Sequence, residues 1–148
     1  MFDPPFARQD WLSLLSRSDT RSLDRLLSQT PPLPGFSRLR GPEIGMSMVR
    51  ARAGGGGEAF NLGEMTLARC SIRDEAGRIG HGYAAGRDGA LVELIARLDA
   101  ALQDAALYPA YEREVLLPLA QAERDRRAQN AAKAAASDVQ FFTLAAMR

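Results

Sequence analysis

Hydrophobic positions near the start of the chain follow helical spacing. The leucines after Trp11 give residues Arg8 to Arg17 one apolar side, which predicts a short amphipathic helix with Trp11 largely buried. A second short helix is predicted from Thr20 to Ser28, with Asp19 or Thr20 as its N-terminal cap. Three prolines follow within the next six residues, and they end the helical pattern.

The middle of the chain alternates with the period of β-strands. We interpret Gly35 to Gly41 as a connection and expect the first strand after Pro42, with its clearest part from Met46 to Ala53. A glycine loop, Gly54 to Gly57, leads to a second strand from about Met65 to Arg73. That strand places Ala68, Cys70 and Ile72 on one face, which we expect to be the core face.

A third strand is predicted from Arg78 to Ala85, after a turn that ends in Gly77, and the three strands would form an antiparallel meander. Glycines at positions 80 and 82 leave one face of this strand without side chains. That face invites the close approach of a helix, another backbone or a ligand.

The last third of the chain is helical in pattern. We expect a helix from Gly89 to Ala106 capped by Asp88, then one helix from Ala110 to Ala136 or two helices joined at Pro118. The later part, from Gln121 onward, has no apolar stripe, so it is either a solvated arm or is packed by a partner through its alanines.

The segment Val139 to Leu144 is strand-like, and it either completes the domain's own sheet or adds to the sheet edge of a partner. The predicted fold class is α+β: a three- to four-stranded antiparallel meander with N-terminal helices, a packing helix, a long C-terminal helix and a terminal strand. The predicted division is a domain at 1–107 and a helical arm with the terminal strand at 108–148, which we expect to contact a partner.

Composition narrows the class of protein. The chain has 148 residues and a net charge of +1, which argues against nucleic-acid binding driven by bulk charge. No apolar run approaches a membrane span and no signal-peptide pattern is present, so the expected location is the cytoplasm. One cysteine and one histidine exclude an internal disulfide and a cysteine- or histidine-rich metal site. Lys133 is the one lysine, so arginine dominates the basic residues, which fits either anion recognition or a GC-rich genome.

Two groups of residues could carry chemistry. Arg50 and Arg52 point to one face of a strand just before Gly54 and Gly55, where side-chain charge and uncovered amides would suit a phosphate or carboxylate. The alternative is an ordinary hairpin loop. His81 could carry protons in a shared pocket, or it could be a partly exposed hydrogen-bonding residue. Nucleophile-elbow, Walker and Rossmann motifs are missing, so we expect no catalytic residues in this chain.

Several blocks of sequence, in order and at matching spacing, resemble the G subunit of the bacterial carbon–phosphorus lyase system, the PhnG family. The blocks run from Arg8-Gln9-x-Trp11 through Leu39-Arg40, Pro42-Glu43, Arg50-x-Arg52-x-Gly54-Gly55, Phe60-Asn61-Leu62-Gly63-Glu64, Thr66-x-x-Arg69-Cys70, Gly80-x-Gly82-Tyr83 and Gly86-Arg87-Asp88 to Val139-x-Phe141-Phe142-Thr143-Leu144. The chain departs from the family at its end, where a basic, glycine-containing tail is common.

The resemblance implies a role in phosphonate catabolism. In that family the G subunit assembles with H-, I- and J-type subunits, and with an ATP-binding-cassette-like subunit the system replaces the adenine of MgATP by an alkylphosphonate. The resemblance implies no cofactor in this chain and carries over no catalytic residues. We expect anion or substrate contacts at Arg50, Arg52, Gly54, Gly55, Asn61 and His81, and intersubunit contacts at Arg124, Arg127, Phe141, Phe142 and Leu144.

Two function classes remain open at this point. The first is an accessory subunit of a multienzyme complex. The second is a stand-alone phosphate-binding enzyme or domain that uses the arginines, the glycine loop and His81.

Overall fold

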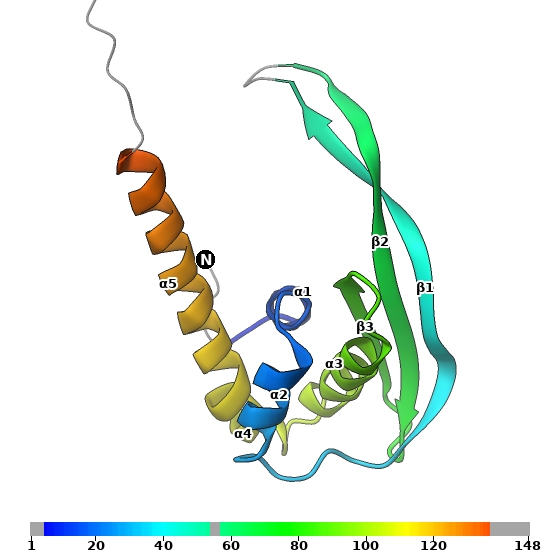
Figure 1. Cartoon of the computed structure of the whole chain (residues 1–148). Coiled ribbons are helices and arrows are strands. Elements are labelled where there is room, and N and C mark those ends of the chain that lie inside the picture. Colours follow the sequence, from blue (N-terminus) through cyan, green and yellow to red (C-terminus); the bar gives the residue numbers. More distant parts are fainter. Residues whose placement is uncertain (1–4, 54–56, 137–148) are drawn as a thin grey trace, which may run out of the picture.

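The chain folds into a three-stranded antiparallel sheet with its helices stacked on one side (Figure 1). The computed structural model describes residues 5–53 and 57–136. The elements are α1 Arg8–Leu15, α2 Thr20–Leu27, β1 Phe36–Arg52, β2 Ala59–Asp74, β3 Ile79–Ala85, α3 Gly89–Leu102, α4 Tyr108–Tyr111, a π-helical turn Glu112–Leu116 and α5 Leu117–Ala136. This confirms the α+β class, while the predicted terminal strand Val139–Leu144 lies outside the described residues.

Aspartates cap two of the helices, as the sequence predicts. Asp19 Oδ1 accepts a hydrogen bond from the backbone N–H of Ser22 at 2.9 Å, and Asp88 Oδ1 accepts one from Leu91 at 2.9 Å. These backbone hydrogen bonds lower the pKa of both carboxyl groups, because they stabilise the ionised form. Asp88 also accepts a hydrogen bond from Thr20 Oγ at 3.0 Å, which ties the start of α3 to the start of α2.

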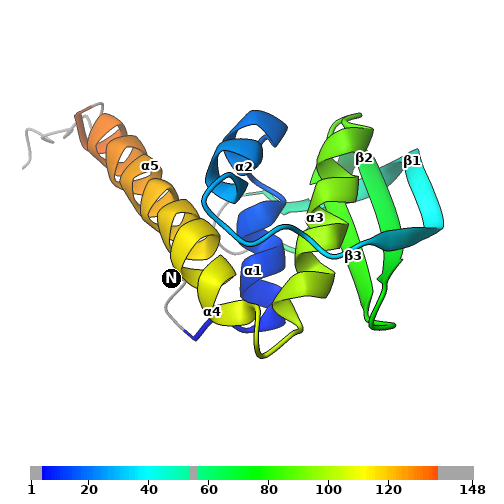
Figure 2. The same cartoon turned by 90° about the horizontal axis from the view of Figure 1, so that it is seen from below.

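The core lies between the sheet and the helices. Ala68, Cys70 and Ile72 of β2 are buried against α3, which confirms the predicted core face. Cys70 is 1% exposed and acts as a small buried side chain. Seen from below, the sheet, α3, the pair α1 and α2, and finally α5 follow one another across the molecule (Figure 2).

Glycines at 80 and 82 let α3 lie directly on β3. A Cβ atom added at Gly80 would stand 1.9 Å from the carbonyl oxygen of Ala96, and one at Gly82 would stand 1.8 Å from that of Val92. The bare face of β3 is therefore a helix-packing surface, one of the roles that the sequence left open.

Both long strands begin earlier than the sequence predicts. β1 starts at Phe36, so the interpretation of Gly35 to Gly41 as a connection is wrong. β1 lies at the edge of the sheet, and its register shifts on both sides of Arg40, where Gly41 and Pro42 are accommodated. β2 starts at Ala59 instead of about Met65. The register shift between Val49 and Arg50 keeps β1 and β2 paired in this stretch, where strict alternation of apolar and polar residues is lost.

The first two strands extend well beyond the third. β3 stops pairing with β2 at Leu67, and from there β1 and β2 continue alone as a twisted hairpin (Figure 1). We call this part the ribbon and define it as residues 46–52 and 59–66. The ribbon and α5 stand on opposite sides of the helical body and project in the same general direction.

The C-terminal helix is anchored at its start and exposed beyond it. Tyr111, Val115, Leu116 and Ala120 belong to the buried core, and the backbone N–H of Leu117 bonds to Glu112 in the π-helical turn just before Pro118. From Gln121 onward, Glu123 is the one residue of α5 that is buried within the described structure. Within the described ranges, no helix is both long and apolar enough to cross a bilayer.

Candidate functional site

Three of the predicted anion-contact residues meet at the far end of the ribbon. Arg50 pairs with Asn61 across the two strands, and Arg52 lies two residues further along the same face. All three side chains are exposed. Arg52 Nη1 donates a hydrogen bond to the carbonyl oxygen of Gly57 at 3.2 Å. We call Arg50, Arg52 and Asn61 the arginine corner; Gly54 and Gly55 lie outside the described residues.

The arginine corner supplies charge but little enclosure. Two guanidinium groups on one strand face have the geometry to grip phosphate or carboxylate oxygens. Because both are exposed, water and salt screen their attraction for a free anion. Tight binding of an anion at this corner therefore requires a second surface from another molecule.

His81 lies in a different part of the sheet. Its ring Nδ1 is 2.9 Å from Ser71 Oγ on β2, and its backbone N–H donates to Asp99 Oδ2 at 2.8 Å. Ser71 is ten residues along β2 from Asn61, a separation of about 33 Å in an extended strand. One copy of the chain therefore does not bring His81 to the arginine corner.

Ser71, His81 and Asp99 do not form a catalytic triad. Asp99 bonds to the backbone of His81 and not to its ring, so it does not orient the imidazole toward Ser71. The partly buried ring of His81 instead acts as a hydrogen-bonding residue on the sheet, one of its two expected roles. No group of three potential metal ligands occurs in residues 5–53 and 57–136.

Asp99 is a buried polar centre that sequence reasoning missed. Its carboxylate is fully buried and accepts hydrogen bonds from Arg8 Nε at 3.0 Å, Arg8 Nη2 at 2.7 Å and Trp11 Nε1 at 2.9 Å, besides that from His81. The hydrogen bond with Asp99 raises the pKa of the Arg8 guanidinium. These hydrogen bonds attach α1 and β3 to α3, so the role of Asp99 is structural.

A signal for this centre was present in the sequence. Asp99 follows Ile95 by four residues, so it falls on the apolar side of its helix, where an unpaired carboxylate would be costly. Arg8 and Trp11 are three apart on α1 and therefore share a face. What the sequence could not show is that these two helices lie side by side.

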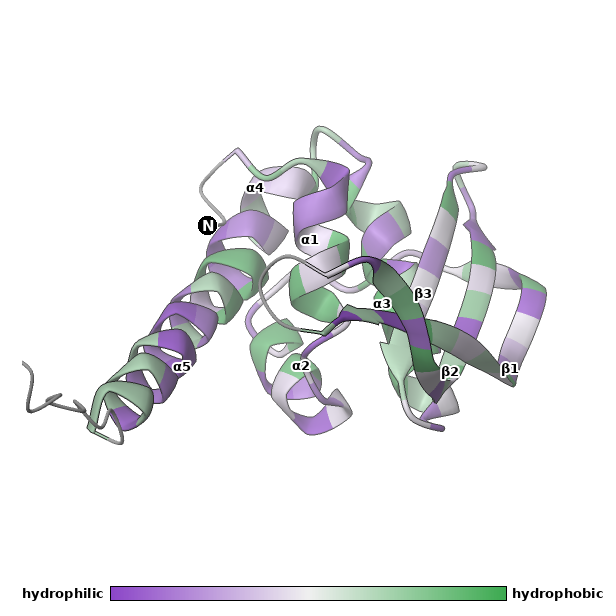
Figure 3. Cartoon of the chain, turned by 90° about the horizontal axis from the view of Figure 1, so that it is seen from above, coloured by the Kyte–Doolittle hydropathy of each residue, from purple (hydrophilic) through white to green (hydrophobic). Residues whose placement is uncertain are grey.

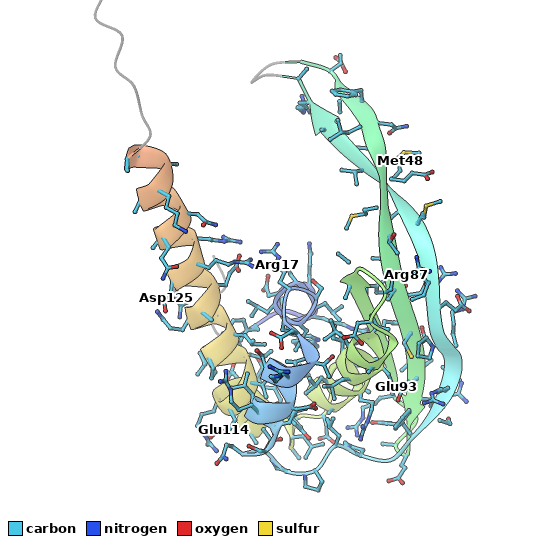
Figure 4. The ribbon with its side chains drawn as sticks, in the orientation of Figure 1. Arg17, Met48, Arg87, Glu93, Glu114 and Asp125 are labelled. Atoms are coloured by element: carbon cyan, nitrogen blue, oxygen red, sulfur yellow. The ribbon has the colours of Figure 1, made fainter. Side chains whose placement is uncertain are left out.

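A second buried carboxylate holds the start of α5. Glu123 is 9% exposed and accepts hydrogen bonds from Arg17 at 3.0 Å and Arg127 at 2.8 Å, with Arg126 also in contact. Burial raises the pKa of Glu123, but the hydrogen bond from Arg127 and the charges of Arg126 and Arg127 outweigh burial, so the net pKa is lowered. Figure 4 shows Arg17 reaching from the end of α1 toward α5.

The two arginines expected at an interface are partly engaged within the chain. Arg127 bonds to Glu123, and Arg124 Nη2 donates to Gln121 Oε1 at 3.0 Å. Phe141, Phe142 and Leu144 lie outside the described residues. A pocket of about 170 Å³ beside α5 includes Glu123, Arg17 and Arg126 in its lining, and these groups already bond to one another.

Hydrophobic stretches run along the ribbon (Figure 3). Their large side chains are exposed on both faces, since strand alternation puts Met46 and Met48 on one face and Met65 on the other. Met46 is 71% exposed and Met48 is 52% exposed, and Figure 4 shows Met48 far from the helices. Ile44, Phe60, Leu62 and Met65 are also exposed. So much exposed apolar surface on one extended element is typical of a protein interface.

Comparisons with known proteins give one family. The family model described as "Phosphonate metabolism protein PhnG" matches residues 6–146. A curated relative from Rhizobium meliloti (strain 1021), named alpha-D-ribose 1-methylphosphonate 5-triphosphate synthase subunit PhnG, is 37% identical over 139 residues, which cover 93% of this chain and 87% of the relative.

Proposed function

Since the chain belongs to the PhnG family of phosphonate metabolism proteins, we propose that it is an accessory subunit of a ribose 1-alkylphosphonate 5-triphosphate synthase. The observation that carries the proposal is the match over 93% of the chain to a relative named as a subunit of that synthase. The complex exchanges the adenine of MgATP for an alkylphosphonate in the cytoplasm. The partners are H-, I- and J-type subunits and an ATP-binding-cassette-like subunit.

The accessory role is supported by the chemistry of the described residues. Asp99 is fully occupied by structural hydrogen bonds, and the ring of His81 pairs with a serine that no carboxylate helps to activate. The arginine corner is open to solvent on a projecting ribbon. A stand-alone enzyme would need an enclosed site, so these features favour a subunit whose catalytic partner is another chain.

An omission experiment tests this role. The H-, I- and J-type subunits and the ATP-binding-cassette-like subunit from the same organism are purified and mixed with MgATP and methylphosphonate, with and without this chain. Adenine release is expected with the chain present and a loss of at least ~100-fold is expected without it. Adenine release by this chain alone would contradict the accessory role and favour a stand-alone enzyme.

We also propose that the arginine corner meets an anion in the assembled complex, the triphosphate or phosphonate of the substrate. The rival is a carboxylate of a neighbouring subunit, which the same geometry would accept. Replacing Arg50 and Arg52 with lysine keeps the charge but removes the bidentate geometry. We expect the complex to assemble and its synthase rate to fall at least ~10-fold, equal to about 1.4 kcal/mol of transition-state stabilisation.

The two other outcomes separate the alternatives. Failed assembly of the lysine variant would favour the carboxylate partner. Intact assembly with an unchanged rate would end the substrate-binding proposal. Position 81 is not included in this variant, because it lies too far along the sheet to share the anion within one chain.

The exposed part of α5 and the residues after it are proposed as intersubunit contacts. Arg124 and Arg127 stand where α5 leaves the core, and a helix without an apolar stripe gains stability when a partner covers its alanines. Phe141, Phe142 and Leu144 would bury apolar surface in the same assembly.

A further inference from the structure

The outer edge of β1 changes character along its length. Between Phe36 and Glu43 it carries Arg38, Arg40, Pro42 and two register shifts, the features by which natural sheets block the pairing of an edge strand. Between Ile44 and Val49 the strand has no charged residue and no proline. Its other side pairs with β2, so in the described structure the outer edge has no strand partner.

This unprotected stretch is also apolar. Ile44, Met46 and Met48 lie on one face by strand alternation, and Ile44 pairs with the buried Ala68, so this face continues the core face of the sheet. All three side chains are nevertheless exposed, and α3 lies away from the ribbon that carries Met46 and Met48. An open edge and an apolar face six residues long fit one added strand.

The same chain contains a segment of matching length and character. Residues 139–144, Val-Gln-Phe-Phe-Thr-Leu, are six in number, uncharged and rich in β-forming side chains. Two residues separate them from Ala136, the last residue of α5. Two uncharged strand-forming segments of equal length are suited to pair with each other.

Geometry favours pairing between two copies over pairing within one copy. The step from Ala136 to residue 139 spans at most about 11 Å. Figure 2 shows α3 and the pair α1 and α2 lying between the sheet and α5, and two packed helix layers are about 20 Å thick. Beyond the body, α5 and the ribbon project on opposite sides of it (Figure 1). This separation exceeds the reach of about 11 Å, so we assign the pairing to a second copy.

We propose that residues 139–144 of a second copy of this chain add as a strand to Ile44–Val49 of β1. The exchange is reciprocal, so a two-fold dimer contains two such pairings. In each copy the outer edge of Ile44–Val49 is then covered by the other copy. The pairing buries Met46 and Met48 of one copy under Phe141 or Phe142 of the other. It requires neither substrate nor another type of subunit, so it stands independently of the proposed role in the synthase.

The test measures the mass of the purified full-length chain in solution by light scattering across a dilution series. A dimer is expected. The double variant Met46→Glu, Met48→Glu and a chain ending at Ala136 should each weaken the dimer at least ~100-fold. The matched control Ser37→Glu places a charge on the protected half of the same strand and should leave the dimer unchanged.

A cross-link makes the test independent of folding defects in the glutamate variant. A tagged copy with Ser47→Cys is mixed with an untagged copy with Thr143→Cys, and the one natural cysteine is buried. Disulfide formation between the two copies is expected, with none for Ser37→Cys paired with Thr143→Cys. A chain that carries both Ser47→Cys and Thr143→Cys tests the same pairing within one copy. Four results would each overturn the proposal: a monomeric full-length chain, a dimer that neither change weakens, equal disulfide yields for the Ser47→Cys and Ser37→Cys pairs, or a disulfide within the chain that carries both cysteines.

Discussion

Asp99 shows how one buried charge holds three elements together. Its two oxygens accept hydrogen bonds from the side chains of Arg8 and Trp11 and from the backbone of His81, which joins α1 and β3 to α3. A buried carboxylate is tolerated when its hydrogen bonds are satisfied and its charge is paired. The side chain of Arg8 is 44% exposed, so the pair touches water on one side only.

Replacing Asp99 with asparagine tests this centre. The amide has the shape of the carboxylate, but its NH2 group would face N–H donors of Arg8 or His81, and Arg8 would lose its charge partner. We expect a loss of about 2–4 kcal/mol in the free energy of unfolding, measured by urea denaturation. Asp24→Asn at an exposed position is the control and should change stability by less than ~0.5 kcal/mol. Equal effects of the two variants would show that Asp99 does not hold the core.

Trp11 is the one tryptophan, so its emission reports this region directly. It is 7% exposed and stacks in a tilted arrangement with Tyr108, with ring centroids 6.0 Å apart. We expect blue-shifted fluorescence in the folded protein, and truncation to alanine should cost roughly 3–5 kcal/mol of stability. Native emission at the wavelength of water-exposed tryptophan would contradict this placement.

At the scale of elements, the contact between α3 and β3 depends on backbone approaching backbone. The oxygens of Val92 and Ala96 occupy the space where side chains of β3 would stand. The sequence signals this contact through its alternate glycines, because a strand that loses side chains on one face gains a close neighbour there.

The variant Gly82→Ala should therefore be strongly destabilising. The new methyl group would meet the carbonyl of Val92, which the helix cannot move without giving up its other contacts. We expect a loss of about 3 kcal/mol or more in thermal or urea unfolding. Gly63→Ala is the matched control on the ribbon, where an added Cβ meets nothing within 4 Å, and its change should stay within ~0.5 kcal/mol. A stable Gly82→Ala protein would mean that α3 and β3 are further apart.

The anchoring of α5 through Glu123 predicts a dependence on pH. Its pKa in the folded chain is below the ordinary value of 4.5, so its stabilising effect is present above that value and is lost as pH falls through the folded pKa. Wild type should be more stable than Glu123→Gln at pH 7, and the difference should shrink toward zero between pH 5 and about pH 3. A difference that stays constant over this range in urea titrations would show that the charge of Glu123 is unimportant.

Elements were predictable from the sequence where one local pattern decides the outcome. The caps at Asp19 and Asp88, the core face with Cys70 and the exposed later part of α5 all follow from spacing and composition. The extent of β1 was not predictable, because a glycine followed by a proline, as at Gly41 and Pro42, ends most strands. β1 accommodates both residues because it is an edge strand whose register shifts there. Asp99 was missed because its partners come from α1 and β3, distant in sequence, and only tertiary packing brings them together.

At the scale of the whole molecule, two elements project from a small core. The ribbon exposes apolar side chains on both faces, and the later part of α5 exposes polar and alanine side chains. The two elements stand on opposite sides of the body (Figure 1). An isolated protein gains nothing from solvating Met46 and Met48, whereas a subunit gains interface area from them. The shape, the open arginine corner and the membership of the PhnG family together support a subunit that works by assembly.

Assembly is therefore the central claim, and co-purification tests it most directly. The tagged chain is co-expressed with untagged H-, I- and J-type subunits from the same organism, and the eluted material is weighed by native mass spectrometry. We predict one complex that contains all four types of subunit in fixed proportion. Elution of this chain alone, while the other three subunits assemble without it, would contradict the account.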